Sequence, residues 1–200
     1  MIMKTVIFGG TFNPVHNGHL NVIRSVIREL KPDRFIVMPT GIPPHKQAND
    51  LASDSDRLKM LKLAVADIPE VIISDYEIQK GGRSYTFETL EHLNMVYPDD
   101  ELYFVMGTDM LSSFLSWRNP DIIMSLATLV GISRDDDDTE LIRLSSERIN
   151  EAGGRCILIN CEPYEASSTE IRNGIKNGEA CELLPESVYD YIKLRGLYNA

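Results

Sequence analysis

The chain has 200 residues, 43% of them hydrophobic, and a formal net charge of -10. Its length favours one domain, residues 1–200, and the acidic balance argues against nucleic-acid binding through a broad basic face, so a phosphate ligand would need a local positive pocket. No apolar run approaches the ~20 residues that cross a bilayer, and no leader-like segment is evident, so we expect a cytoplasmic protein without a membrane partner.

Short apolar runs typical of buried strands alternate with helical patterns along the chain. The strand-like runs lie at 4–8, 34–38, 71–74, 102–106, 128–132 and 157–160. Helical stripes comprise Leu20, Ile23, Val26, Ile27 and Leu30, then Leu58, Leu61, Lys62 and Val65, then Phe87, Leu90, Leu93 and Val96, with Thr86 expected as an N-cap. Further helix starts are expected at Asn119-Pro120, near Thr139 and at Leu184-Pro185.

This alternation predicts an α/β fold with a doubly wound parallel sheet. We expect a Rossmann-like sheet of five to six strands with helices on both faces, and a small C-terminal helical segment from about residue 167 packed onto it. Ligands of such sheets bind beyond the C-terminal strand ends, at the point where the strand order reverses.

A glycine-rich turn follows the first strand-like run. It reads Gly9-Gly10-Thr11-Phe12-Asn13-Pro14-Val15-His16-Asn17-Gly18-His19 and leads into the first helical stripe. Such a turn leaves backbone N–H groups at a helix N-terminus, where the helix dipole favours anions by ~0.3–1 kcal/mol. His16 and His19 are three residues apart, so both can face one ligand, although they could also simply close the turn. The sequence has neither GxGxxG nor the P-loop motif, which indicates a different kind of nucleotide site.

Two other segments could contact phosphates. Ser167, Ser168 and Thr169 open a predicted helix that carries Arg172 one turn later, a suitable cradle for β- and γ-phosphates or an ordinary N-cap. The segment 40–54 is the one long polar connection, and it begins Gly41-Ile42-Pro43-Pro44-His45-Lys46. Long loops beside a strand end are often functional.

The segment Gly9–His19 resembles the GTFDPxHxGH signature of the HxGH nucleotidyltransferase superfamily, and 166–172 resembles the ISSTxIR motif of the same enzymes. Asn13 stands where the signature has Asp. An amide there keeps the hydrogen-bonding capacity of the carboxylate and removes a negative charge.

Other segments resemble nicotinate-nucleotide adenylyltransferases in particular. They are Pro43-Pro44-His45-Lys46, Ser84-Tyr85-Thr86, Gly107-Thr108-Asp109 with Trp117 eight residues beyond the aspartate, and Arg134. Together the matching segments run from Lys4 to Arg172 in the expected order. The resemblance implies transfer of the adenylyl group of ATP to nicotinate mononucleotide, giving nicotinate adenine dinucleotide and pyrophosphate.

The resemblance also implies residue roles. Its catalytic residues would be His16, His19, Lys46 and Arg172. Its ATP-binding residues would be Gly9, Gly10, Thr11, Phe12, His16, His19, Gly107, Asp109, Arg134, Ser167, Ser168, Thr169 and Arg172. Its mononucleotide-binding residues would be His45, Lys46, Ser84, Tyr85, Thr86, Trp117 and Arg118. Mg²⁺ would be held mainly by the ATP phosphates, with no metal ligand assigned to the protein, and a homo-oligomer is possible.

Several alternatives remain open from the residues alone. A pantetheine-phosphate adenylyltransferase or a cytidylyltransferase has a similar first motif, and a non-catalytic nucleotide sensor would be compatible with Asn13. Trp117 could belong to the core, since indole rings bury a large apolar area. The run Asp135–Asp138 is interpreted as a solvated loop rather than a Mg²⁺ site, His92 as a surface or packing residue, and the three cysteines, which form no CxxC pair, as structural thiols in a reducing compartment.

Overall fold

One parallel sheet organises the chain in a computed structural model that describes residues 2–41, 51–133, 139–162, 164, 167–177, 179 and 182–199. Its six strands follow the order β3-β2-β1-β4-β5-β6. They are β1 (Lys4–Gly10), β2 (Arg34–Pro39), β3 (Val71–Ile73), β4 (Glu101–Gly107), β5 (Ala127–Ser133) and β6 (Cys156–Asn160). Every strand-like run is therefore confirmed as a strand, and the order reverses between β1 and β4.

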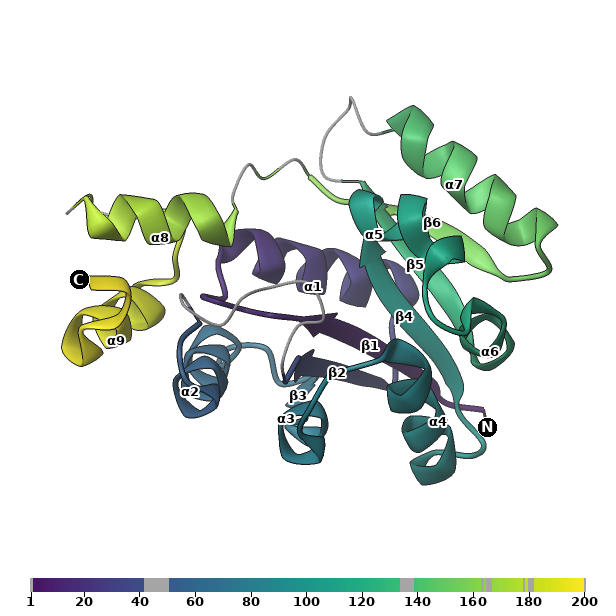
Figure 1. The fold of residues 1–200 in the computed structure, drawn as a ribbon, viewed down its shortest axis with the longest axis horizontal. Coiled ribbons are helices and arrows are strands. Elements are labelled where there is room, and N and C mark those ends of the chain that lie inside the picture. The colour runs from purple at the N-terminus through teal and green to yellow at the C-terminus, as the bar shows by residue number, and fades with distance from the viewer. Residues whose placement is uncertain are drawn as a thin grey trace.

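Helices cover both faces of this sheet (Figure 1). They are α1 (Asn17–Leu30), α2 (Asp54–Ala64), α3 (Tyr76–Lys80), α4 (Thr86–Val96), α5 (Thr108–Ser113), α6 (Pro120–Leu126), α7 (Thr139–Glu151), α8 (Ser168–Lys176) and α9 (Glu186–Arg195), with 3-10 turns η2 (Phe114–Ser116) and η3 (Leu197–Asn199). Successive strand residues point to opposite faces: Val6 and Phe8 pack with α1, α2, α8 and α9, whereas Ile7 packs with α4 to α7. The predicted α/β, Rossmann-like class is confirmed.

Three details of the predicted helices are wrong. The buried face of α2 contains Arg57 and Met60, whereas Lys62, assigned to its apolar stripe, is exposed. Arg57 can be buried because carbonyl and carboxylate oxygens accept its N–H groups. At α4 the N-cap is Tyr85 and Thr86 is the first helical residue, because the Tyr85 carbonyl accepts the first helical hydrogen bonds; Val96 is 49% exposed.

The C-terminal segment packs against the same apolar cluster as α1 and α2. Ile171 and Ile175 of α8 and Val188 and Ile192 of α9 are buried in it. In Figure 1, α8 and α9 lie together at one end of the molecule, near the end of α2. Polar contacts also fasten α9 to α2, since Tyr191 donates to Asp56 Oδ1 at 2.8 Å and Arg195 to the same oxygen at 3.3 Å.

Candidate active site

The turn between β1 and α1 brings the two predicted histidines together. His16 is the N-cap of α1, with an extended backbone (φ -143°, ψ 171°), and its N–H donates to His19 Nδ1 at 3.2 Å. The two ring centroids lie 3.7 Å apart, and Phe12 meets the His19 ring edge-on at 5.0 Å. His16 is buried and His19 half-buried. The paired imidazoles thus stand at a helix N-terminus beyond the end of β1, where an anion is favoured.

Gly10 allows the turn to fold back closely. A Cβ at this position would lie 2.9 Å from the Phe12 ring, a distance that side chains do not tolerate. Phe12 itself adopts a left-handed backbone conformation (φ 47°), which non-glycine residues rarely do. The glycine and the strained phenylalanine together direct the chain toward His16.

Donors from distant elements hold the backbone carbonyls of this turn. Arg57 Nη1 donates to the Thr11 oxygen at 2.9 Å, and Arg172 Nη1 donates to the Asn13 oxygen at 2.7 Å. The Ser168 hydroxyl donates to the Pro14 oxygen at 3.1 Å. The first motif and the segment 167–172 are therefore in direct contact, and Arg172 is half-buried there.

Side-chain hydrogen bonds within its first residues cap the start of α8. The Ser167 hydroxyl accepts from the Glu170 N–H at 3.2 Å, and the Glu170 carboxylate accepts from the Ser167 N–H at 3.2 Å. This is a capping box, so the ordinary N-cap interpretation applies to Ser167. Thr169 is exposed, and its hydroxyl accepts from Arg172 Nη2 at 3.3 Å.

The Asn13 side chain joins the turn to two further segments. Its Oδ1 accepts from the Ala52 N–H at 3.0 Å and from the Tyr198 hydroxyl at 2.6 Å. The amide oxygen therefore receives two donors, as a carboxylate oxygen could. Asn13 preserves these hydrogen bonds and places no negative charge beside the histidines.

Two of the segments predicted to bind the mononucleotide, 84–86 and 117–118, contact each other. The Arg118 guanidinium lies 4.8 Å from the centroid of the Tyr85 ring, and hydrogen bonds from Arg83 and Arg118 lower the pKa of the Tyr85 phenol. Trp117 is half-buried: it packs on the α4–α7 cluster, 5.8 Å from the Phe114 ring, and its indole N–H donates to Ser113 at 3.4 Å. Trp117 is thus partly a packing residue.

Arg57 connects this second group of residues to the turn. Its Nη2 donates to the Gly41 oxygen at 3.4 Å, and the Gly41 N–H donates to the Ser84 hydroxyl at 3.1 Å. A continuous polar chain therefore runs from Thr11 through Arg57 and Gly41 to Ser84. Arg57 could not be predicted from the sequence, because charged residues on a helix are usually exposed and no motif surrounds it.

Glu77 of α3 lies next to Gly41, where a Cβ would be 2.8 Å from the Glu77 backbone oxygen. It is buried, and the Thr89 hydroxyl donates to its Oε1 at 2.7 Å. Burial raises the pKa of the Glu77 carboxyl, and hydrogen bonds from Thr89 and Ser84 only partly oppose this. The ionised form is therefore disfavoured in the folded protein.

Glu77→Gln should change how stability depends on pH. Because burial raises the folded pKa of Glu77 above its ordinary value of 4.5, the wild-type protein loses stability as pH rises from about that value through the folded pKa. The neutral amide lacks this loss. Urea unfolding across this range should show the variant gaining stability relative to the wild type as pH rises, and an identical pH dependence of both proteins would contradict the assignment.

Gly107 and Asp109 lie at the end of β4, next to β1 in the sheet. Gly107 is the N-cap of α5, and Asp109 is exposed in its first turn. A Cβ on Gly9 would be 3.8 Å from the Phe104 ring of β4. The predicted ATP-binding glycines thus occupy adjacent strand ends at the reversal of strand order.

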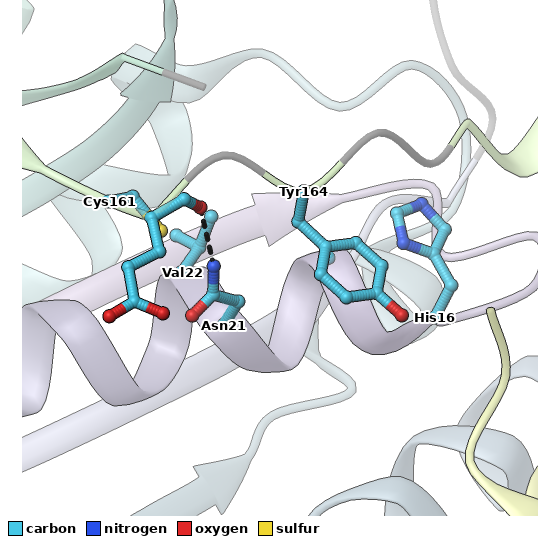
Figure 2. A pocket seen from close by; sticks show the side chains of 7 residues that line it. His16, Asn21, Val22, Cys161 and Tyr164 are labelled. Atoms are coloured by element: carbon cyan, nitrogen blue, oxygen red, sulfur yellow. Dashed lines mark hydrogen bonds between the residues drawn. The ribbon is translucent and has the colours of Figure 1, made fainter. Parts of the chain in front are cut away.

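A pocket opens beside His16, between α1 and the segment after β6 (Figure 2). Its lining residues are His16, Gly18, Asn21, Val22, Cys161, Glu162 and Tyr164. Asn21 donates to the Glu162 oxygen at 2.7 Å and so fixes one wall. Tyr164 comes close to Gly18, where a Cβ would lie 3.3 Å from the ring. Tyr164 could not be predicted from the sequence, because no motif surrounds it.

Some predicted residues lie outside the described part of the chain, namely His45, Lys46, Arg134 and Asp135–Asp138. Within the described ranges, no group of three or more His, Cys, Asp or Glu residues could hold a metal ion. No helix in those ranges is long and apolar enough to cross a membrane. His92 stacks on Tyr76 with the ring centroids 3.7 Å apart, as expected of a packing residue.

Comparisons with known proteins agree with this arrangement. The cytidylyltransferase-like family model matches residues 7–174. A Clostridium tetani protein named probable nicotinate-nucleotide adenylyltransferase is 41% identical over 198 residues, covering 98% of this chain and 99% of its own length. A Clostridium acetobutylicum protein of the same name is 38% identical over 197 residues, covering 98% of each chain.

A solved structure of Plasmodium falciparum nicotinic acid mononucleotide adenylyltransferase complexed with NaAD shares the fold, with a TM-score of 0.78 over 98% of each chain at 18% identity. The likeness of fold agrees with the sheet order, and the sequence identity to the clostridial proteins extends over nearly the whole chain. The chain therefore belongs to the nicotinate-nucleotide adenylyltransferase family of cytidylyltransferase-like proteins.

Proposed function

We propose that the protein transfers the adenylyl group of ATP to nicotinate mononucleotide, a step of NAD biosynthesis. The observation that carries the proposal is the turn 11–19, which holds the His16–His19 pair and whose Asn13 and Pro14 carbonyls accept hydrogen bonds from Arg172 and Ser168 of α8. Paired imidazoles, a helix N-terminus and a guanidinium form the local positive pocket that an acidic chain needs in order to bind a triphosphate. The names of the full-length relatives support the same reaction.

In this reaction an oxygen of the mononucleotide phosphate attacks the α-phosphorus of ATP. A new O–P bond forms, the bond from the α-phosphorus to the bridging oxygen of the β-phosphate breaks, and pyrophosphate leaves with the electron pair. The attacking phosphate is already anionic near neutral pH, so no protein nucleophile is required. Positioning can lower such a barrier by about 7–11 kcal/mol, and donors aimed at developing charge add to it.

We assign electrostatic roles to the residues around the turn. His16 and His19 contact the α- and β-phosphates, Thr169 and Arg172 hold the leaving pyrophosphate, and Lys46 guides the attacking phosphate. Mg²⁺ neutralises phosphate charge when bound. We assign the ion to ATP oxygens and water rather than to a carboxylate cage of the protein.

The mononucleotide is assigned to the group of residues around Tyr85. Arg118 and Arg83 both act on the Tyr85 phenol, so positive charge gathers at this end of α4. Such charge favours a ring that carries a carboxylate, as in nicotinate, over one that carries a neutral amide. Trp117 adjoins Arg118 and supplies an aromatic surface for the pyridine ring.

Trp117→Ala should raise the KM for nicotinate mononucleotide by about tenfold, because an aromatic stacking contact contributes ~0.5–1.5 kcal/mol beyond its buried area. The KM for ATP should stay within about twofold of the wild-type value, because the variant loses binding energy only toward nicotinate mononucleotide. Steady-state kinetics with each substrate varied in turn measures both values. Equal increases for the two substrates would show a general loss of structure instead.

The proposed reaction is tested by pyrophosphate release from ATP and Mg²⁺ with separate acceptors. Nicotinate mononucleotide, nicotinamide mononucleotide and phosphopantetheine are supplied one at a time, with an acceptor-free reaction as the blank. We expect release with nicotinate mononucleotide and none with phosphopantetheine. Release with phosphopantetheine alone would overturn the proposal in favour of a pantetheine-phosphate adenylyltransferase.

A further inference from the structure

One side chain of the C-terminal turn η3, that of Tyr198, contacts the turn 11–16, which we call the phosphate-binding turn. The Tyr198 hydroxyl donates to Asn13 Oδ1 at 2.6 Å, across 185 residues of sequence. Tyr198 holds a left-handed backbone conformation (φ 58°, ψ 23°), which costs a non-glycine residue free energy and persists only where the surroundings enforce it. Burial raises the pKa of the Tyr198 phenol, so the hydroxyl keeps its proton throughout the neutral range.

Asn13 transmits this contact to the rest of the turn. The same Oδ1 accepts from the Ala52 N–H at 3.0 Å, and the Asn13 carbonyl accepts from Arg172 at 2.7 Å. Asn13 is buried and lies three residues before His16. A shift of Asn13 would therefore move the carbonyl that Arg172 holds and the backbone that leads to His16.

We propose that Tyr198 is a positioning residue for adenylyl transfer, acting through its hydrogen bond to the side chain of Asn13. The proposal rests on the function proposed above and adds the C-terminal turn to the machinery of that site. A displacement of about 1 Å in a part of the protein distant from the reacting atoms can lower the rate about 10²-fold. Loss of the single hydrogen bond from the Tyr198 hydroxyl to Asn13 is therefore sufficient to affect catalysis. Because Tyr198 lies behind the turn, its loss should act on kcat rather than on KM.

The chain offers a matched control on the same C-terminal segment. Tyr191 of α9 donates to Asp56 Oδ1 at 2.8 Å, so it too ties the C-terminal segment to the body of the protein through one phenol. Its acceptor lies on α2 and not in the phosphate-binding turn. Tyr191→Phe therefore removes a comparable hydrogen bond of the C-terminal segment and leaves the hydrogen bonds of Asn13 unchanged.

The experiment measures kcat, both KM values and the thermal midpoint for Tyr198→Phe, Tyr191→Phe, Asn13→Leu and the double variant Tyr198→Phe/Asn13→Leu. We expect Tyr198→Phe to lower kcat about tenfold, the loss of one hydrogen bond, with both KM values within about threefold. In the Asn13→Leu background the same change should have no further effect on kcat, because the acceptor is already gone. Tyr191→Phe should lower the thermal midpoint and leave kcat unchanged.

An unchanged kcat in Tyr198→Phe, an equal fall in Tyr191→Phe, or additive effects of the two site variants would overturn the positioning role. Should Asn13→Leu fail to fold, Asn13→Asp serves in the same cycle. Its carboxylate still accepts the bond, so Tyr198→Phe must then lower kcat by at least as much as it does in the wild type. A wild-type protein that forms no dinucleotide would overturn the proposed function as well, whereas an active wild type with an insensitive Tyr198 would overturn the positioning role alone.

Discussion

Replacing His19 by alanine should lower kcat by about 10²–10³-fold, the usual effect of removing one donor that stabilises transition-state charge. The KM for ATP should change much less, because the glycine turn, the helix N-terminus and Arg172 still bind the ground-state triphosphate. The expectation rests on the contact of His19 with His16, whose rings lie 3.7 Å apart at the start of α1. Steady-state kinetics with ATP varied at saturating mononucleotide separates the two parameters.

His92→Ala is the matched control for this experiment. His92 lies in α4 and stacks on Tyr76, away from the turn that holds His16 and His19. Its removal should leave kcat unchanged and cost only some stability. An unchanged turnover number in His19→Ala would rule out its assigned role, whatever the KM.

Arg172→Ala should lower kcat by about 10²–10³-fold and also destabilise the protein. The guanidinium holds the Asn13 and Ser168 carbonyls at 2.7 and 3.0 Å, so its loss leaves two carbonyls without a charged donor, at about 1–3 kcal/mol each when buried. Loss of contact with the leaving group should weaken inhibition by added pyrophosphate. Product-inhibition kinetics and urea unfolding measure the two effects separately.

One further variant separates charge from geometry at this position, and another serves as a control. Arg172→Lys keeps the charge but cannot reproduce the planar fork of donors, so it should recover only part of the activity. Arg143→Ala removes an exposed arginine of α7 that pairs with Glu140 and Glu147, and its kinetics should match the wild type. Full activity in Arg172→Ala would contradict the proposed pyrophosphate contact.

The strands follow from local sequence pattern, and the candidate site residues follow from motifs. Each strand-like run became a strand because buried parallel strands are nearly continuous apolar runs, and the alternation with helices leaves few possible topologies. The contact between the turn 11–14 and Ser168 and Arg172 is long-range, yet the two motifs already pointed to one ligand.

Features that depend on tertiary partners could not be predicted from the sequence. From the sequence alone, Arg57 resembles a solvated helix residue. Its burial depends on the Thr11 and Gly41 carbonyls, which accept hydrogen bonds from its guanidinium. Tyr198 has no local signal at all, because its acceptor lies at the other end of the chain. The N-cap of α4 is Tyr85, one residue before the predicted Thr86. Side-chain propensity does not locate a helix end to within a single residue.

The most direct test of the central claim is the identity of the product. The protein is incubated with ATP, Mg²⁺ and equal amounts of nicotinate mononucleotide and nicotinamide mononucleotide, and the dinucleotides are identified by mass spectrometry. We predict nicotinate adenine dinucleotide as the main product, formed in equal amount to pyrophosphate. The absence of that dinucleotide, or a main product that carries the nicotinamide ring, would contradict the account.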